Sequence, residues 1–338
     1  MISTMALVVE AQDQIAWRSR ELDDSLVDEV LIAPTVVGLC GTDLEIISGL
    51  IDPGYIRYPV VLGHEWAGVV KSDGPLLGKL VVVEGIIPCW HCAMCRAGRT
   101  NLCEVYQEIG FTRDGAAAQL ISVPSQLVHV LAPGVTALRG CLVEPSAVVY
   151  QALLKSSPAP NLKVLIVGDG TIALLAAHLL SLFSPNSIDM VGRRAAQANL
   201  AESAGVTNFH TSPDEVSAVY DLVIEAAGSP ESVETAVRKA KRGATVTLLG
   251  LTGNSSRASL VVDDIVNNDL EILGSFSYTS KSFSKIVELI NSSQIAPEFL
   301  ITHRFPITDW AGALATLSQS AGARGKVILE LNQIPGAL

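Results

Sequence analysis

Basic residues are scarce in this sequence, and they do not form runs. Lys and Arg number 23 against 34 Asp and Glu, which gives the 338 residues a net charge of −11. Proteins that bind nucleic acids neutralise phosphates with clustered cations, so this composition argues against a nucleic-acid surface. A nucleic-acid partner is therefore not expected.

Targeting and membrane-spanning patterns are also lacking. The N-terminus has no charged region followed by a long apolar run, so no signal peptide is expected. Residues 164–183 are mostly apolar, but Gly168, Asp169, Gly170 and His178 interrupt them, which argues against a membrane span. We therefore expect a cytoplasmic protein with no membrane partner. Its length and its 49% hydrophobic content suggest about two domains.

Cysteines, by contrast, are concentrated in one short segment. Four of the six have the spacing C-x2-C-x2-C-x7-C, and in a reducing cytosol such clusters bind metal more often than they form disulfides. Four soft ligands so close together indicate a closed tetrahedral zinc site. A nucleic-acid zinc ribbon would use the same ligands, but Arg96 and Arg99 are the only basic residues within the cluster, so a structural lobe is preferred. The predicted ligands are Cys89, Cys92, Cys95 and Cys103.

Two other segments contain possible zinc donors. Cys40 lies in the segment G-L-C-G-T-D, and His64 and Glu65 follow a glycine further along the chain. Taken singly, the first is a glycine-rich turn with a buried thiol and the second is an ordinary structural histidine. Together they offer thiolate, imidazole and carboxylate, all of which Zn²⁺ accepts. Glu144 is an acid in an apolar segment before a predicted helix, which indicates a metal ligand, a cap or a salt bridge.

The segment 163–191 has the pattern of a dinucleotide-binding unit. A buried strand is predicted at 163–167, a G-x-G-x-x-A turn follows, and residues from Ile172 to Phe183 predict one apolar face of a helix before a strand at 188–191. In such a unit the glycines allow a tight turn and let the backbone approach a pyrophosphate at the helix N-terminus. The alternative is an ordinary βαβ unit whose glycines only turn the chain. The predicted coenzyme contacts in the turn are Gly168, Gly170, Thr171, Ile172 and Ala173.

The remaining pattern predicts two different kinds of sheet. Residues 5–37 contain apolar segments alternating with polar ones, as in an antiparallel β domain. Beyond residue 146, strand and helix patterns alternate, which predicts a doubly wound parallel sheet. A helix is expected at 280–291 and a final strand at 326–329. The predicted parallel strands are 163–167, 188–191, 221–226, 244–249 and 270–273.

The order of these motifs along the chain resembles one enzyme family. The family is the zinc-dependent medium-chain dehydrogenases/reductases, the alcohol dehydrogenase superfamily. The resemblance covers about residues 5–331, and it rests on G-L-C-G-T-D, G-H-E, the four-cysteine spacing, V-E-P, G-x-G-x-x-A and the segment D-L-V-I-E-A-A-G at 221–228. Within the family the chain looks most like polyol, threonine and 2-deoxy-scyllo-inosamine dehydrogenases, the last because of His64-Glu65-Trp66 and residues 110–115.

The resemblance implies an α/β fold with two domains. A GroES-like, mostly antiparallel catalytic domain would comprise residues 1–146, with the zinc lobe at 89–103, and the C-terminal return over 277–338 would complete it. A Rossmann domain, with a doubly wound parallel sheet, would occupy residues 147–276. The active cleft would lie between the two domains.

The resemblance also implies a catalytic zinc ion in addition to the structural one. Cys40 and His64 would bind this ion, with Glu144 as the third protein ligand or Glu65 as an alternate, and the fourth position would stay open. Asp43 matches the carboxylate that orients the ligand histidine.

The implied activity is that of an NAD(P)-dependent alcohol dehydrogenase acting on a small-molecule secondary alcohol of the polyol, sugar or aminocyclitol class. Thr42 matches the hydroxyl that relays the proton while the hydride passes to the nicotinamide. Many relatives carry a histidine three residues after this hydroxyl, whereas this chain has Glu45. Either Glu45 ends the relay, or the proton leaves through water or a substrate hydroxyl.

Coenzyme choice departs from the common NAD pattern. An NAD enzyme places an acid at the end of the second strand, where it binds the ribose hydroxyls. Here that strand ends at Gly192, Arg193 and Arg194 follow, and Asp189 stands too early. Guanidinium groups can bind a 2′-phosphate through bidentate bonds, so NADP(H) is predicted over NAD(H), with Arg193 as the main contact. The alternative is that both arginines simply face solvent.

Oligomeric state and two other functions complete the expectations. Family members form dimer contacts after the last strand of the coenzyme domain, where Phe276 and Tyr278 stand, so a homodimer or homotetramer is expected; both aromatics could equally belong to the core.

A zinc-bearing, NADPH-binding regulator without turnover would keep the fold but lose relay or metal residues. A zinc-free enone or quinone reductase of the same fold would lack the cysteine lobe.

Overall fold

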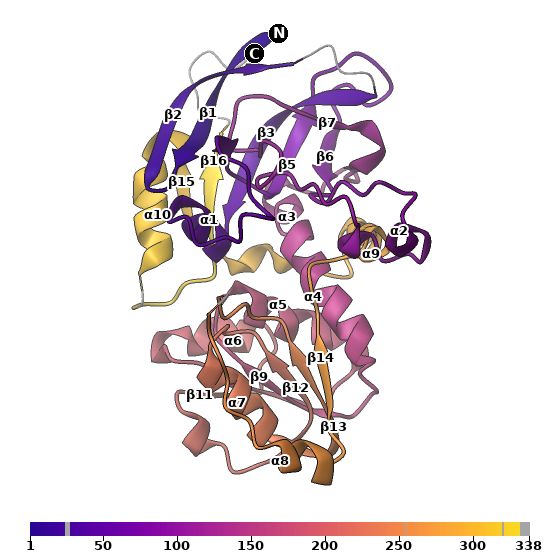
Figure 1. The fold of residues 1–338 in the computed structure, drawn as a ribbon, viewed down its shortest axis with the longest axis vertical. Coiled ribbons are helices and arrows are strands. Elements are labelled where there is room, and N and C mark those ends of the chain that lie inside the picture. The colour runs from indigo at the N-terminus through magenta and orange to yellow at the C-terminus, as the bar shows by residue number, and fades with distance from the viewer. Residues whose placement is uncertain (24–27, 254, 320, 332–338) are drawn as a thin grey trace. The chain divides into compact units, whose positions relative to one another are not determined.

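The chain forms two compact units (Figure 1). It passes from the first unit to the second between Glu144 and Pro145 and returns to the first after Tyr278. None of the helices in the described part of the chain is long and apolar enough to cross a membrane. The computed structural model describes residues 1–23, 28–253, 255–319 and 321–331.

The C-terminal return differs from the sequence expectation in one place. Residues 277–338 were expected to belong to the first unit without interruption, but the contacts of residues 321–325 place them in the second unit. The reason is that side chains of the second unit hold this backbone. Thr171 and Gln197 donate hydrogen bonds to the carbonyl groups of Gly325 and Arg324.

The first unit contains a small antiparallel sheet with the strand order β2-β1-β4. A tight turn joins β1 to β2, and Asp13 occupies it with a φ of 58°. Aspartate tolerates this left-handed conformation better than most residues, which favours the hairpin. The strands are β1 (Ile2–Ala11), β2 (Gln14–Leu22) and β4 (Val60–Val61).

The larger sheet of the first unit has seven strands in the order β15-β16-β3-β5-β6-β8, with β7 also paired to β3. Every pair is antiparallel except β15 with β16. The C-terminal strand β16 therefore lies directly beside β3, although most of the sequence separates them. The strands are β3 (Glu29–Leu39), β5 (Glu65–Val70), β6 (Leu80–Val83), β7 (Ile121–Pro124), β8 (Val128–Val130), β15 (Ile301–Pro306) and β16 (Lys326–Glu330).

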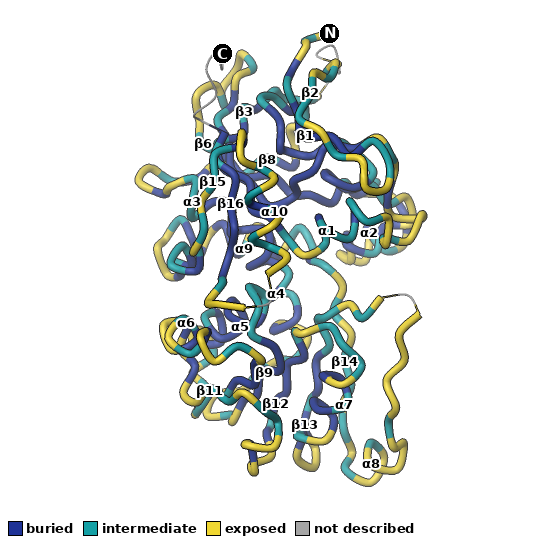
Figure 2. Tube along the Cα trace, turned by 90° about the vertical axis from the view of Figure 1, so that its left-hand side faces the viewer, coloured by how far each residue is buried: buried dark blue, intermediate teal, exposed yellow. Residues whose placement is uncertain are grey.

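The apolar core of the first unit combines side chains from both sheets. Leu7, Val37, Leu62 and Val327 are all fully buried in it, and each contributes about 1.5–3 kcal/mol through burial. Figure 2 shows β16 as largely buried tube, whereas β2 and β15 are intermediate to exposed. Around them lie α1 (Gly41–Ile47), α2 (Ala93–Arg96), η1 (Thr100–Leu102), η2 (Ser125–Leu127), α3 (Ala137–Gly140), α9 (Ser280–Asn291), η6 (Pro297–Leu300), η7 (Ile307–Asp309) and α10 (Trp310–Ser318).

The second unit contains one parallel sheet with the order β11-β10-β9-β12-β13-β14. This confirms the predicted doubly wound sheet, and the order reverses between β9 and β12. The sequence missed β11, which is only three residues long and contains a single apolar residue. The strands are β9 (Lys163–Val167), β10 (Ser187–Val191), β11 (Asn208–His210), β12 (Tyr220–Glu225), β13 (Ala240–Leu248) and β14 (Glu271–Gly274).

Helices cover the parallel sheet on both faces, because right-handed crossovers on either side of the reversal place them so (Figure 1). The helix after the glycine turn corrects one expectation: a single apolar face was predicted, but α5 is buried on almost every side, and Phe183 lies beyond its end. The helices are α4 (Val143–Ser156), α5 (Thr171–Leu180), η3 (Ser181–Phe183), η4 (Ala195–Gln197), α6 (Ala198–Ser203), η5 (Pro213–Glu215), α7 (Pro230–Arg238) and α8 (Val262–Asn267).

A fully buried carboxylate organises the loops beside the reversal point. Glu225 ends β12, and its Oε1 accepts hydrogen bonds from the backbone N–H of Ala227 (2.8 Å) and Gly228 (2.7 Å) and from the hydroxyl of Ser232 (2.7 Å). Its Oε2 accepts from the N–H of Gly250, which follows β13. One side chain thus ties together the loops that follow two neighbouring strands.

Replacing this carboxylate should destabilise the second unit. In Glu225→Gln an amide NH₂ would face backbone donors, and each lost hydrogen bond to a charged group is worth about 1.5–3 kcal/mol. We expect the free energy of unfolding to fall by about 2 kcal/mol or more in denaturant titration. Glu231→Gln, which removes an exposed acid from the first turn of α7, is the control and should have a much smaller effect. Equal stability of the two variants would contradict this role.

Candidate metal and coenzyme sites

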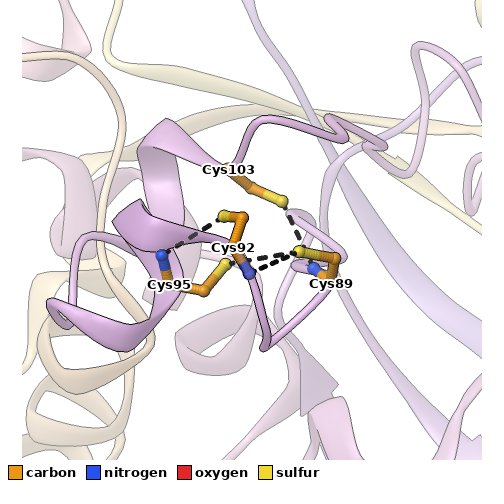
Figure 3. Close-up of side chains that lie close together, drawn as sticks. All are labelled: Cys89, Cys92, Cys95 and Cys103. Carbon is orange, nitrogen blue, oxygen red and sulfur yellow. Dashed lines mark hydrogen bonds between the residues drawn. The ribbon is translucent and has the colours of Figure 1, made fainter.

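Four cysteine side chains come together in the first unit (Figure 3). Their sulfur atoms all lie within 4.8 Å of one another, and three of the four residues are buried. The short helix α2 and the turn η1 position them, since Cys92 caps α2, Cys95 lies within it and Cys103 ends η1. The structure therefore brings together all four residues that the spacing predicted.

Backbone N–H groups point at these sulfurs. Cys92 N–H donates to the sulfur of Cys89 (3.4 Å), Cys95 N–H to that of Cys92 (3.4 Å) and Cys89 N–H to that of Cys103 (3.3 Å). Bonds from the N–H groups of Glu104 and Cys95 lower the pKa of the Cys92 thiol to about 6. Burial raises the pKa of the Cys95 thiol to about 12, so the case for zinc rests on the mutual reach of the four sulfurs, which suits a tetrahedral Zn²⁺ ion.

A second donor set lies where β3 and β5 pair. Ligand atoms of Cys40, His64 and Glu65 lie within 4.8 Å of one another. Cys40 follows β3, while His64 and Glu65 stand at the start of β5, and the register pairs Gly38 with Glu65. A Cβ atom on Gly38 would lie 2.6 Å from Glu65 Oε2, so only glycine leaves room for this carboxylate.

Lys326 is a functional candidate that the sequence analysis missed. Its side chain is 3% exposed, and its ammonium group donates to Glu65 Oε2 and to the Leu39 carbonyl at 3.2 Å. Burial acts to lower the pKa of Lys326, but the charges of Glu65 and Cys40 outweigh burial and raise it. A lysine that begins an apolar C-terminal strand was the available signal, but only the pairing of β16 with β3 places it beside Glu65.

Asp43 faces the imidazole of His64. Asp43 Oδ1 lies 3.7 Å from His64 Nδ1, and neither atom has a hydrogen-bond partner among the described residues. Asp43 Oδ2 accepts from Cys40 N–H at 2.8 Å, which holds the carboxylate in place. Burial acts to lower the pKa of His64, but Asp43 and Cys40 outweigh it and raise the pKa well above its usual value. The ring of Phe111 packs against the imidazole, with 5.1 Å between centroids.

Two more buried acids stand near this set. Burial, with smaller contributions from Glu65 and Glu108, raises the pKa of Glu144 to about 8 despite the attraction of His64. Glu108, which the sequence analysis also missed, accepts a hydrogen bond from Tyr106, and burial raises its pKa.

Geometry ranks the two proposed third ligands differently from the family resemblance. Glu65, rather than Glu144, lies within reach of both Cys40 and His64. Burial raises the pKa of Asp43, Glu108 and Glu144, as expected for acids without enough cationic charge around them, and a divalent cation would supply that charge. These residues therefore suit a divalent metal ion.

The remaining catalytic candidates lie on α1. Thr42 Oγ1 is 3.5 Å from the sulfur of Cys40, so its hydroxyl lies next to the second donor set. Glu45 stands one turn further along the helix, and partial burial raises its pKa.

The glycine turn of the second unit has the geometry of a coenzyme cradle. Gly168 has a φ of +130°, and a Cβ atom there would lie 2.8 Å from the backbone of Ala226, so β9 and β12 approach closely only with glycine. A Cβ atom on Gly170 would meet nothing within 4 Å. Gly170 caps α5 without a side-chain bond, which leaves the first N–H groups of α5 for an anion, and Ala173 packs fully buried behind it. Thr171 and Ile172 begin the helix.

The arginines after β10 are arranged differently from each other. Arg194 forms a salt bridge with Asp169 at 2.9 Å and is 11% exposed, whereas Arg193 is exposed. Both backbone N–H groups donate to Asp169 Oδ2, at 2.9 and 3.0 Å. Burial acts to raise the pKa of Asp169, but its bonds to Arg194 outweigh burial and lower it. A Cβ atom on Gly192 would lie 2.5 Å from that of Asp169, so the carboxylate fills the space of a side chain at position 192.

Two family models match the chain. Residues 27–133 match the alcohol dehydrogenase GroES-like domain, and residues 137–330 match the glucose dehydrogenase C-terminus. Among curated relatives, L-galactonate-5-dehydrogenase of Escherichia coli K12 is 29% identical over 92% of this chain and 94% of its own length. Galactitol 1-phosphate 5-dehydrogenase of the same organism is 30% identical over 89% of this chain and 92% of its own length.

Solved structures agree with these relatives. A structure described as a zinc-binding dehydrogenase from Sinorhizobium meliloti 1021, bound to NADP, has a TM-score of 0.89 at 27% identity and covers 98% of this chain and 100% of its own. Galactitol-1-phosphate dehydrogenase from Escherichia coli has a TM-score of 0.84 at 27% identity, with coverage of 97% and 100%. The resemblance noted in the sequence is thereby confirmed, and the chain belongs to the zinc-dependent medium-chain dehydrogenases/reductases, the alcohol dehydrogenase superfamily.

Proposed function

We propose that this protein oxidises a secondary alcohol of the polyol, sugar or aminocyclitol class with NADP⁺, or reduces the matching ketone with NADPH. The observation that carries the proposal is the convergence of Cys40, His64 and Glu65 in the first unit, in a chain whose second unit holds a glycine turn open to a dinucleotide. The curated relatives support the substrate class, because their names describe dehydrogenases of a sugar acid and of a sugar-alcohol phosphate. In this proposal the first unit is the catalytic domain and the second is the coenzyme domain.

We further propose that each chain holds two zinc ions. Cys89, Cys92, Cys95 and Cys103 would hold the structural ion, and Cys40 and His64 the catalytic ion with Glu65 or Glu144 as third ligand. When bound, the catalytic ion supplies a Lewis acid that polarises the alcohol oxygen and lowers its pKa.

The chain's own residues then supply orientation and proton movement. Asp43, whose Oδ1 lies 3.7 Å from His64 Nδ1, would orient the ring of His64, as carboxylates beside ligand histidines do. The Thr42 hydroxyl takes the alcohol proton and passes it either to Glu45 on the same helix or to water or a substrate hydroxyl. Lys326 balances Glu65 and so controls whether that carboxylate is available to a metal ion. Residues 168–173 would hold the coenzyme, whose nicotinamide would supply the hydride acceptor or donor.

The protein is also proposed to form a homo-oligomer. Several large apolar side chains between residues 251 and 276 of the second unit are exposed, on either side of the edge strand β14 in sequence, and exposed apolar groups can mark interfaces. Phe276 is 38% exposed and fits this role, whereas Tyr278 is buried at 1%. The others are Leu251, Val261, Val262 and Val266, with exposures between 62% and 70%.

Metal content and activity test the proposal together. Wild-type protein should contain two zinc ions per chain and should reduce NADP⁺ with at least one member of a panel of polyols, aminocyclitols, sugars and β-hydroxy amino acids. Cys40→Ser should lose turnover but keep the fold and about one zinc ion. Cys92→Ser should unfold the lobe, because structural zinc contributes folding energy directly. Cys141→Ala, a buried thiol outside both sets, should keep both ions. Full activity in protein that contains no zinc would contradict the proposal.

The proton relay has its own test. Thr42→Ala should lower kcat by about 10²-fold or more, because positioned proton transfer contributes about that much. Thr42→Ser keeps the hydroxyl and should have a mild effect. Steady-state kinetics on a secondary alcohol decide the question: a Thr42→Ala enzyme as active as wild type would show that the proton takes another route.

Coenzyme preference is tested at Arg193. Arg193→Ala should raise the KM for NADP⁺ by about tenfold or more, since hydrogen bonds to charged groups are worth about 1.5–3 kcal/mol, and should affect NAD⁺ far less. Arg193→Lys should give an intermediate KM for NADP⁺, because lysine keeps the positive charge but lacks the guanidinium group that forms paired hydrogen bonds. Gly192→Asp would not test coenzyme preference alone, because the new side chain would clash with Asp169. A wild-type enzyme with higher kcat/KM for NAD⁺ would overturn the preference.

A further inference from the structure

Residues 321–325 are hydrogen-bonded to the glycine turn at residues 168–173 and to Gln197, although the two segments are far apart in sequence. Thr171, the first residue of α5, donates from Oγ1 to the carbonyl of Gly325 at 3.2 Å. Gln197 Nε2 donates to the carbonyl of Arg324 at 2.8 Å, and Arg324 N–H donates back to Gln197 Oε1 at 2.9 Å. This reciprocal pair fixes both backbone groups of Arg324.

Gln197 also reaches the glycine turn itself. Its Nε2 donates to the carbonyl of Asp169 at 2.7 Å, and the side chain is fully buried. A single amide group therefore connects Arg324 to the residue between the two glycines. A buried amide with all these bonds made is costly to replace, and its geometry leaves Arg324 little freedom relative to Asp169.

The side chains at this place carry an excess of positive charge. Asp169 provides one carboxylate, Arg194 and Arg324 provide two guanidinium groups, and the backbone N–H of Arg193 also bonds to Asp169. Burial, followed by the charge of Arg194, lowers the pKa of Arg324, and Asp169 only partly offsets this effect. Arg194 Nη1 is buried and has no hydrogen-bond partner in the part of the chain that the structure describes. Neighbouring guanidinium groups, one of which has a nitrogen without a hydrogen-bond partner among the described residues, form a site that suits an anion.

We propose that Arg324 is a specificity-determining residue for the coenzyme, binding the 2′-phosphate of NADP(H) together with Arg193 and Arg194, and that Gln197 is the residue that positions it. This inference rests on the proposed use of NADP(H). Asp169 has a defined part in it: the carboxylate holds Arg194 in place and occupies the space beside Gly192 where an NAD enzyme has its acid. Asp169 engages Nε and Nη2 of Arg194, so that guanidinium would meet the phosphate through Nη1, beside Arg193 and Arg324.

Fluorescence titration of the zinc-loaded enzyme with NADPH and NADH tests the inference. Both coenzymes contain the pyrophosphate, and only NADPH has the 2′-phosphate, so their ratio of dissociation constants isolates the proposed site. Arg324→Ala should raise the dissociation constant of NADPH by about tenfold to a hundredfold, the range expected for a lost charge-assisted hydrogen bond. The dissociation constant of NADH should rise far less. Arg324→Lys should be intermediate. Arg242→Ala, which removes an exposed arginine of β13, is the matched control and should leave the ratio unchanged.

Gln197 needs a readout that a structural role alone would not change. Gln197→Ala should lower the NADPH/NADH affinity ratio in the same direction as Arg324→Ala, and it should add little to the ratio in the Arg324→Ala background. Thermal unfolding of each variant reports separately on stability. If Gln197→Ala lowers the melting temperature and leaves the ratio unchanged, its positioning role is wrong. If that variant does not fold, the Arg324 variants alone decide the inference.

The outcomes separate this inference from the proposed function. A wild-type enzyme that binds NADH more tightly than NADPH overturns both. A wild type that prefers NADPH, loses this preference in Arg193→Ala and keeps it in Arg324→Ala overturns only the role of Arg324. Loss of the preference in both single variants, with the Arg242→Ala ratio equal to wild type, supports the inference.

Discussion

Buried negative charge is the constraint on which the first unit depends. Asp43, Glu65 and Glu144 are 0%, 1% and 8% exposed, and a carboxylate taken out of water is stable only if a cation or hydrogen bonds compensate it. Lys326 compensates Glu65, and His64 faces Asp43. Metal binding at this point would therefore act on stability and on chemistry at once, as it would among the four thiols of the cysteine lobe.

The second unit uses carboxylates in another way. Glu225 ends β12 and Asp169 follows the neighbouring strand β9, and each accepts hydrogen bonds from backbone N–H groups of adjoining loops. Ligands of doubly wound sheets bind at this edge, where the strand order reverses. The two side chains thus convert the loops into a defined cradle, and Asp169 also sets the charge at the end where the coenzyme's 2′ group would lie.

Local pattern was enough to predict much of the fold and of the candidate sites. The strands at 163–167 and 326–329 and the helix at 280–291 were predictable because β-branched runs and helical periodicity are properties of short segments. Strand β11 was not, because three residues carry no periodicity. The cysteine lobe was predictable because its donors lie within one short stretch, so the chain can bring them together without help from the rest of the fold.

The sequence by itself determined which residue types were available and which of them were neighbours along the chain: the cysteine spacing, the glycine turn and the arginines that follow β10. The tertiary structure alone decided the contacts between distant segments. Lys326 meets Glu65 across 261 residues because β16 pairs with β3, and Arg324 meets Gln197 across 127 residues because the return path crosses the coenzyme turn. Strand order and register determine which distant residues come into contact. Both depend on how whole sheets pack, which no short segment encodes.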